Sequence, residues 1–288
     1  MKFPDPTLMA VTLLLLVPSL LPAQRPLFVF DNGLTDIVGH DAKAAIVAEL
    51  GYQGVGWRPG DTTGMLAALD KHGVKMAATY VALKPSAGTV PVSDAVIREI
   101  DALKGQDTIV WLGILGPKNS LTDEAALKAI HQVADVAERN NLKVALYPHT
   151  GFYTDTAPEC LRLARLANRK NVGVSFNLCH FLLQTDSSKL ESEIREIAPL
   201  LYLVSLNGAN DARKMPVLPL GEGSFDTRRL LRVLDEVDYK GLVGLQCFQV
   251  KAPARDHLTK SMEAWKEFHR PGGEPKSPPS GETNSLLQ

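Results

Sequence analysis

Eight short apolar segments separated by amphipathic stretches most restrict how this 288-residue chain folds. These segments are mostly apolar throughout, which is typical of parallel strands buried on both faces. The expected strands are Leu27–Phe30, Gly54–Trp57, Lys75–Tyr80, Thr108–Leu115, Lys143–Tyr147, Val172–Phe176, Leu201–Leu206 and Leu242–Phe248.

Helical patterns lie between these strands. Two of them, Ala42–Leu50 and Met65–Lys71, stop at or near a glycine, which readily takes the left-handed conformation that ends a helix. A later helix is expected to begin at Asp226, because aspartate is a favourable N-cap. This alternation predicts an α/β fold, a (β/α)8 TIM barrel that forms a single domain over residues 26–271. An open doubly wound sheet is the main alternative, but no glycine-rich nucleotide-binding sequence follows the first strand.

Both ends of the chain differ in composition from the expected barrel. Lys2 precedes an apolar run, Val11–Val17, and Ala23 then stands before a polar residue, so residues 1–23 are interpreted as a secretory signal peptide. The run is shorter than the roughly 20 apolar residues that span a bilayer. We therefore expect a periplasmic or extracellular protein with no membrane attachment after cleavage. Residues 272–288 are polar and rich in proline and glycine, and are expected to form a disordered tail.

Charge and cysteine content restrict the possible partners. The formal net charge is −1, so there is no basic excess to neutralise phosphates, and nucleic acid is not an expected partner. Cys160, Cys179 and Cys247 are expected to be buried free thiols. Cys179 stands beside His180 in a strand-like segment, which suggests a nucleophile. Neighbours on a strand point to opposite faces, however, so direct contact is disfavoured.

The C-terminal ends of the strands carry the active sites of such barrels. The side chains expected there are polar, aromatic and nearly uncharged, which suits a neutral sugar or polyol as the small-molecule partner. Of the seven histidines, His149 and His180 follow strands, whereas the other five lie in or beside helical segments. The expected substrate-binding residues are Asp31, Trp57, Arg58, Tyr80, Tyr147, Asn177, Asn207, Gln246 and Phe248.

Four short motifs carry a family resemblance. They are Leu50–Val55 after the first helix, Gly73–Lys75 before the third strand, Gly221–Asp226 before the seventh helix, and Tyr239–Gly241 before the last strand. In this order and spacing they resemble the xylose-isomerase-like sugar phosphate isomerases and epimerases, over roughly Pro26 to Pro271. Fold-level likeness does not by itself establish function.

The resemblance implies a divalent metal held by two glutamates, an aspartate and a histidine from late strands. The corresponding positions here are Tyr147, Asn177, Ser205 and Gln246. Hard divalent ions prefer anionic oxygen ligands, so we expect the family's metal site to be lost or greatly weakened, and no cofactor. A softer ion held by His149 and His180 is the remaining alternative.

Reactions of such enzymes on keto-sugars begin with removal of a proton next to a carbonyl group. This step needs a base and a donor to the enediolate oxygen. Catalytic candidates are His149 and His180 as the base and Lys251 among the donors. Asn177, Gln246 and Tyr147 are further donors, and Asp31 or Glu222 is expected to orient a histidine.

Three functions therefore stay open at this point. An isomerase or epimerase is favoured over a metal-free saccharide-binding barrel, and a keto-sugar lyase would share the same first step. A DNA-repair endonuclease with this barrel needs a multi-zinc cluster of histidines and acids, which the sequence does not supply.

Overall fold

The computed structural model describes residues 25–85, 92–211 and 217–270, and within them eight parallel strands form a closed barrel. Each strand pairs with the next in sequence, and β1 pairs with β8 to close the barrel. The predicted TIM barrel is confirmed, and an open sheet is excluded. The strands are β1 Leu27–Phe30, β2 Gly54–Trp57, β3 Lys75–Leu83, β4 Ile109–Ile114, β5 Lys143–Leu146, β6 Val172–Asn177, β7 Leu201–Leu206 and β8 Leu242–Leu245.

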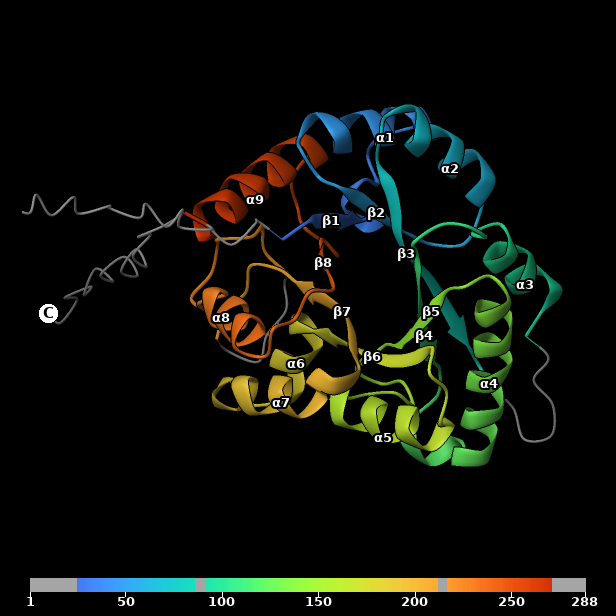
Figure 1. Ribbon diagram of the computed structural model, residues 1–288. Helices are drawn as coiled ribbons and strands as arrows, with labels where there is room; N and C mark the ends of the chain where they lie inside the picture. Colours follow the sequence, from blue (N-terminus) through green and yellow to red (C-terminus); the bar gives the residue numbers. More distant parts are fainter. Residues whose placement is uncertain (1–24, 86–91, 212–216, 271–288) are drawn as a thin grey trace, which may run out of the picture.

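Helices form a ring outside the strands (Figure 1). The described helices are α1 His40–Glu49, α2 Thr62–Lys71, α3 Asp94–Asp101, α4 Asp123–Arg139, α5 Ala157–Ala167, α6 Leu178–Gln184, α7 Leu190–Ile197, α8 Arg228–Glu236 and α9 Ala254–Phe268. The prediction that Asp226 is the N-cap of α8 is wrong by one residue. Thr227 is its N-cap, and the Asp226 carboxylate instead accepts the backbone N–H of Arg228 at 3.1 Å.

Strand residues alternate between two apolar cores, as the period of two of a β-strand requires. In β4, Val110 and Leu112 belong to the large core shared with the helices, whereas Ile109 and Trp111 belong to a smaller cluster. That smaller cluster contains strand residues and Tyr147 just after β5, with no helix residue among its described members, so it fills the inside of the barrel.

Glycines on neighbouring strands make room for the aromatic rings inside the barrel. A Cβ on Gly56 would stand 2.4 Å from Phe30, and one on Gly244 would stand 2.3 Å from Phe28. These residues are glycine because the rings occupy the space of a side chain. The Phe28 and Phe30 rings meet edge to face at 4.9 Å between centroids.

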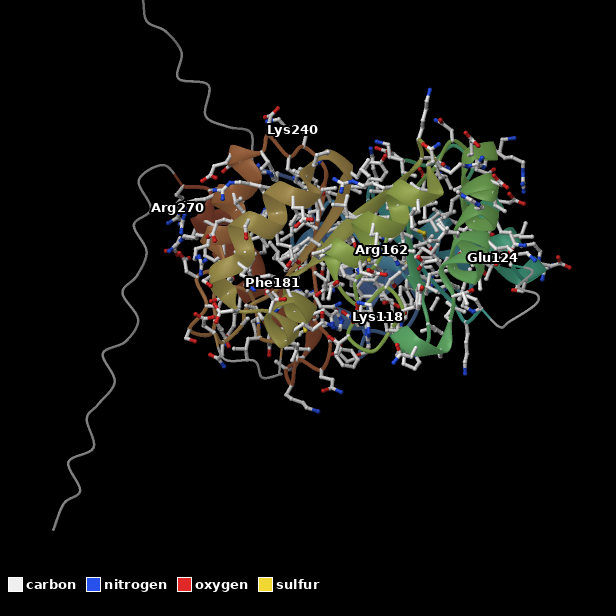
Figure 2. The ribbon with its side chains drawn as sticks, turned by 90° about the horizontal axis from the view of Figure 1, so that it is seen from below. Lys118, Glu124, Arg162, Phe181, Lys240 and Arg270 are labelled. Atoms are coloured by element: carbon white, nitrogen blue, oxygen red, sulfur yellow. The ribbon has the colours of Figure 1, made fainter. Side chains whose placement is uncertain are left out.

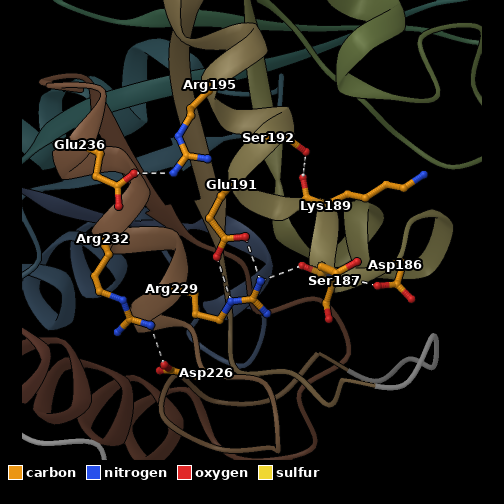
Figure 3. A network of polar contacts seen from close by, with 11 residues as sticks. Asp186, Ser187, Lys189, Glu191, Ser192, Arg195, Asp226, Arg229, Arg232 and Glu236 are labelled. Carbon is orange, nitrogen blue, oxygen red and sulfur yellow. Dashed lines mark hydrogen bonds and ion pairs between the residues drawn. The ribbon is translucent and has the colours of Figure 1, made fainter.

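Arg229 links two helices on the outside of the barrel (Figure 3). Its guanidinium donates two hydrogen bonds of 2.9 Å to the carboxylate of Glu191 in α7, and a third of 3.0 Å to the carbonyl of Ser187. These bonds join α8 to the start of α7.

The barrel has distinct ends, and the site lies at one of them. In the view from below, Lys240, before β8, and Lys118, after β4, lie toward opposite ends (Figure 2).

None of the helices in the described ranges is long and apolar enough to span a membrane. The expected signal peptide, 1–23, and the expected tail, 272–288, lie outside the described residues.

Candidate functional site

A cavity of about 350 Å³ opens where the strands end at their carboxyl termini. It falls within the size range of small-molecule sites. Its lining residues are Phe30, Asp31, Asn32, Gly56, Trp57, Arg58, Ala78, Tyr80, Trp111, Tyr147, His149, Cys179, His180, Gln246 and Phe248.

Most of the predicted site residues meet at this cavity. Those that line it are Asp31, Trp57, Arg58, Tyr80, Tyr147, His149, His180, Gln246 and Phe248. Strand ends distant in sequence therefore converge as the barrel rule requires.

Three predicted residues do not line the cavity. Asn177 ends β6, and its side chain bonds to neighbouring protein groups. Its oxygen caps α6 by accepting the N–H of His180 at 3.3 Å, and its amide nitrogen donates to the Tyr147 hydroxyl. Asn207 is buried, and its amide donates to the carbonyl of Gly208 at 2.7 Å. Lys251 is exposed in the loop after β8. Their predicted contact with a ligand therefore has no support from the lining of this cavity and stays a prediction.

The expected partners of the histidines are also different. Asp31 accepts a 2.7 Å hydrogen bond from Arg58, and Glu222 forms an ion pair with Lys260 at 3.6 Å. Neither carboxylate contacts a histidine among the hydrogen bonds of the described residues. The peptide groups of Thr150 orient both rings instead.

Sequence reasoning missed Trp111, whose buried side chain lines the cavity. Its ring lies 3.7 Å from that of Tyr147 and 4.7 Å from that of Phe30, measured between centroids. Its indole N–H donates to the Ser175 hydroxyl at 2.7 Å, and this hydroxyl donates in turn to the Leu146 carbonyl. Trp111 lies within an apolar strand, so only strand alternation could have placed it inside the barrel.

His149 lies on a turn directly after β5. Its backbone N–H donates to the carbonyl of Thr154, and its own carbonyl accepts the N–H of Phe152, both at 2.9 Å. This turn stacks the Phe152 ring on the imidazole, with centroids 3.9 Å apart. The Nδ1 atom lies 2.9 Å from the Thr150 carbonyl, which can only accept, so Nδ1 carries the proton in this contact. In the neutral ring, Nε2 then keeps a free lone pair.

His180 lies on a helix, not in the strand-like segment that the sequence suggested. Asn177 starts α6, so Cys179 and His180 occupy its first turn, and both side chains line the cavity. Burial, and then the neighbouring His149, lower the pKa of His180 to about 3. Burial raises the pKa of the Cys179 thiol to about 11, so this cysteine is not a ready nucleophile. All three cysteines lie in the described ranges and are buried and free of disulfides, as predicted.

The side-chain amides of Asn32 and Gln246 also line the cavity. The backbone N–H of Cys247 donates to the side-chain oxygens of Asn32 and Gln246, at 3.2 and 3.1 Å. The Asn32 amide nitrogen also donates to the Gln246 oxygen. These contacts fix the orientation of both amides and leave the Gln246 Nε2 hydrogens available to a ligand.

The cavity carries no net formal charge. Among the described residues that line it, Asp31 is the one carboxylate and Arg58 the one guanidinium, and the two are paired. Such a site favours an uncharged ligand.

The residues around the cavity do not fit a metal ion. Both nitrogens of His180 are engaged, Nδ1 with Thr150 and Nε2 with Tyr147, and only Nε2 of His149 is free. No group of three histidine, cysteine, aspartate or glutamate side chains in the described part of the chain is arranged to hold a metal. In the described part of the chain, the alternative of a softer ion held by His149 and His180 therefore has no preformed site.

Solved structures with the same fold cover most of the chain. They include the IOLI protein with a bound zinc atom (16% identity, TM-score 0.67, 85% of this chain and 98% of that one). They also include the 3-keto-D-glucoside 4-epimerase YcjR from E. coli (15% identity, TM-score 0.67, 84% of this chain and 98% of that one). A third is D-allulose 3-epimerase from Methylomonas sp. (15% identity, TM-score 0.67, 86% of this chain and 99% of that one). These identities establish a shared fold alone.

A search of curated protein sequences finds no match. The model of the xylose isomerase-like TIM barrel family matches residues 44–268, most of the barrel. The chain therefore belongs to the xylose isomerase-like TIM barrel family.

Proposed function

We propose that the chain is an isomerase or epimerase that acts on a neutral keto-sugar by moving a proton next to the carbonyl group. The observation that carries this proposal is the state of His149. Its Nδ1 is committed to the Thr150 carbonyl, so its Nε2 can accept a proton in an uncharged, aromatic cavity.

The proposed first step balances without a cofactor. His149 Nε2 takes the proton from the carbon next to the carbonyl, and the electrons of that C–H bond form a carbon–carbon double bond. The carbonyl oxygen gains the negative charge and is held by hydrogen-bond donors, for which Gln246 Nε2 and the Tyr147 hydroxyl are the candidates. The epimer forms when water protonates the other face of the same carbon, and the resulting hydroxide takes the proton from His149. The isomer forms when His149 gives its proton to the former carbonyl carbon and the proton of the neighbouring hydroxyl moves to the enediolate oxygen.

Electrostatics and shape support a sugar as substrate. Aromatic rings of Trp57, Tyr80 and Phe248 line the cavity and suit the C–H faces of a sugar ring. The fold is shared with a keto-glucoside epimerase and a D-allulose epimerase. Among the described residues that line the cavity, the Asp31–Arg58 pair leaves no unpaired charge to bind a phosphate. We further propose that the protein is exported, because of the signal-like residues 1–23.

Solvent deuterium exchange tests this proposal without knowledge of the product. The untagged full-length protein would be treated with EDTA and incubated in D2O with D-allulose, D-fructose, D-tagatose and methyl 3-keto-glucoside. We expect deuterium next to the carbonyl of at least one sugar, detected by NMR. Saturable binding of a sugar with no exchange would instead identify a saccharide-binding barrel. An unsaturated product would identify a lyase.

A further inference from the structure

We infer that His180 is a positioning residue: its imidazole is a fixed hydrogen-bond donor that directs the Tyr147 hydroxyl proton into the cavity, toward the substrate's carbonyl oxygen. The catalytic consequence rests on the proposed function. The hydrogen-bond arrangement itself does not, and it can be measured without a substrate.

The tautomer of His180 follows from one backbone contact. The Thr150 N–H lies 3.3 Å from His180 Nδ1, and an amide N–H can only donate, so Nδ1 accepts. The Thr150 hydroxyl lies 3.1 Å from the same nitrogen and itself accepts a 2.8 Å hydrogen bond from Gln184 Nε2, so its proton is free to point to His180. The neutral ring therefore carries its hydrogen on Nε2.

This hydrogen determines what the Tyr147 hydroxyl can do. His180 Nε2 lies 3.1 Å from the Tyr147 oxygen and donates to it. Asn177 Nδ2 donates to the same oxygen at 3.3 Å, and the N–H of His180 on the Asn177 oxygen fixes the orientation of that amide. With both lone pairs occupied, the hydroxyl can use only its proton. Among the hydrogen bonds of the described residues, no protein acceptor takes that proton, and Tyr147 lines the cavity.

Burial keeps the arrangement uncharged. The lowered pKa of His180 keeps the ring neutral, and burial raises the pKa of Tyr147 well above its ordinary value, so the phenol stays protonated. A hydroxyl that accepts hydrogen bonds becomes a stronger donor through cooperative polarisation. Along the chain of hydrogen bonds from Gln184 through Thr150 and His180 to Tyr147, each group thus donates its hydrogen to the next, and the last hydrogen points toward the ligand.

The first test measures the tautomer directly. Full-length protein labelled with 15N-histidine would be examined by NMR at pH 6, with the His180 signals identified by their absence in His180→Gln. Should that variant misfold, Thr150→Val would identify the ring by the change in its Nδ1 signal. We expect a neutral ring with hydrogen on Nε2. Hydrogen on Nδ1, or a protonated ring, would overturn the inference whether or not the protein is an enzyme.

The second test separates a donor from a base. His180→Gln keeps an acceptor for Thr150 and a donor for Tyr147, whereas His180→Leu keeps neither. With the sugar that shows deuterium exchange, we expect kcat of the glutamine variant to exceed that of the leucine variant by at least about 10-fold. Tyr147→Phe should lose about 100-fold in kcat with little change in KM. Equal losses in both His180 variants, with folding verified by circular dichroism, would contradict the inference. Failure of every sugar would contradict the proposed function, and the NMR result would still decide the inference.

Discussion

The imidazole rings of His149 and His180 lie 4.0 Å apart between centroids, and Thr150 binds the two rings in opposite senses. Its carbonyl accepts from Nδ1 of His149, whereas its N–H donates to Nδ1 of His180. One peptide segment thus gives His149 a free lone pair at Nε2 and gives His180 a hydrogen there. The two histidines therefore have different roles, although the sequence made them look equivalent.

We predict that His149→Gln reduces deuterium exchange by about 100- to 10,000-fold, the range for loss of a general base. His180→Gln should lose much less, since the amide replaces both hydrogen bonds. Rates for the two purified variants with the same sugar check this prediction. A larger loss in His180→Gln would reverse the assignment.

The pH dependence of kcat/KM follows from the state of His149. Burial lowers its pKa from the ordinary value of 6.5, and a base works only when neutral. The acid limb of the kcat/KM profile should therefore be centred below pH 6.5. A pH profile from 4 to 9 would show this limb, and an acid limb centred above 6.5 would contradict the assignment.

Stability should also depend on pH through His180. Its pKa is about 3 in the folded protein and has the ordinary value of 6.5 in the unfolded chain, so unfolding takes up a proton between these values. The contribution of neutral His180 to the free energy of unfolding is therefore fully present above pH 6.5. It is lost as pH falls toward 3, by up to about 1.4 kcal/mol per pH unit. Urea unfolding at several pH values should show a shallower loss in His180→Gln. Parallel curves for the two proteins would exclude this contribution.

Ser175→Ala is expected to disturb the cavity lining at Trp111. It leaves the buried Trp111 N–H without its acceptor, which should cost about 1–3 kcal/mol of folding free energy. Because Trp111 lies against Tyr147, affinity for sugar should also fall. Trp111→Phe removes the donor, so adding Ser175→Ala to it should cost less than the same change in the unmodified protein. Additive costs in urea unfolding would show that the bond contributes little.

Arg229→Ala should destabilise the barrel by about 1–2 kcal/mol, because it removes three hydrogen bonds between partly buried groups. Arg232→Ala is the matched control on the same helix. It removes a single ion pair, with Asp226, which is more exposed than the Arg229 contacts, and should cost less than about 0.5 kcal/mol. Equal midpoints of urea unfolding for these two variants would contradict the weight given to Arg229.

The barrel was predictable because its signals are local. Apolar strands and glycine stops recur along the sequence, and strand ends such as Trp57 and Gln246 converge once the sheet closes. The β8 strand was predicted to reach Phe248 but ends at Leu245, because the pairing stops where the Gln246 and Asn32 amides take the backbone N–H of Cys247.

The roles within the site were not predictable, because they depend on contacts between segments. Whether Asn177 faces the ligand or caps a helix depends on how the chain leaves β6. The sequence does not indicate that Thr150 orients the histidine rings, because its backbone carbonyl and N–H make these contacts and any residue type carries them. Trp111 resembles any other core residue until strand alternation places it inside the barrel.

The most direct test of the central claim is the deuterium exchange rate of metal-depleted protein with an exchanging sugar, measured for the unmodified chain and for His149→Gln. We predict exchange that is unaffected by EDTA and is reduced at least about 100-fold by the substitution. Exchange that needs an added divalent metal, or that continues at full rate in His149→Gln, would contradict the claim that His149 acts as a metal-independent base.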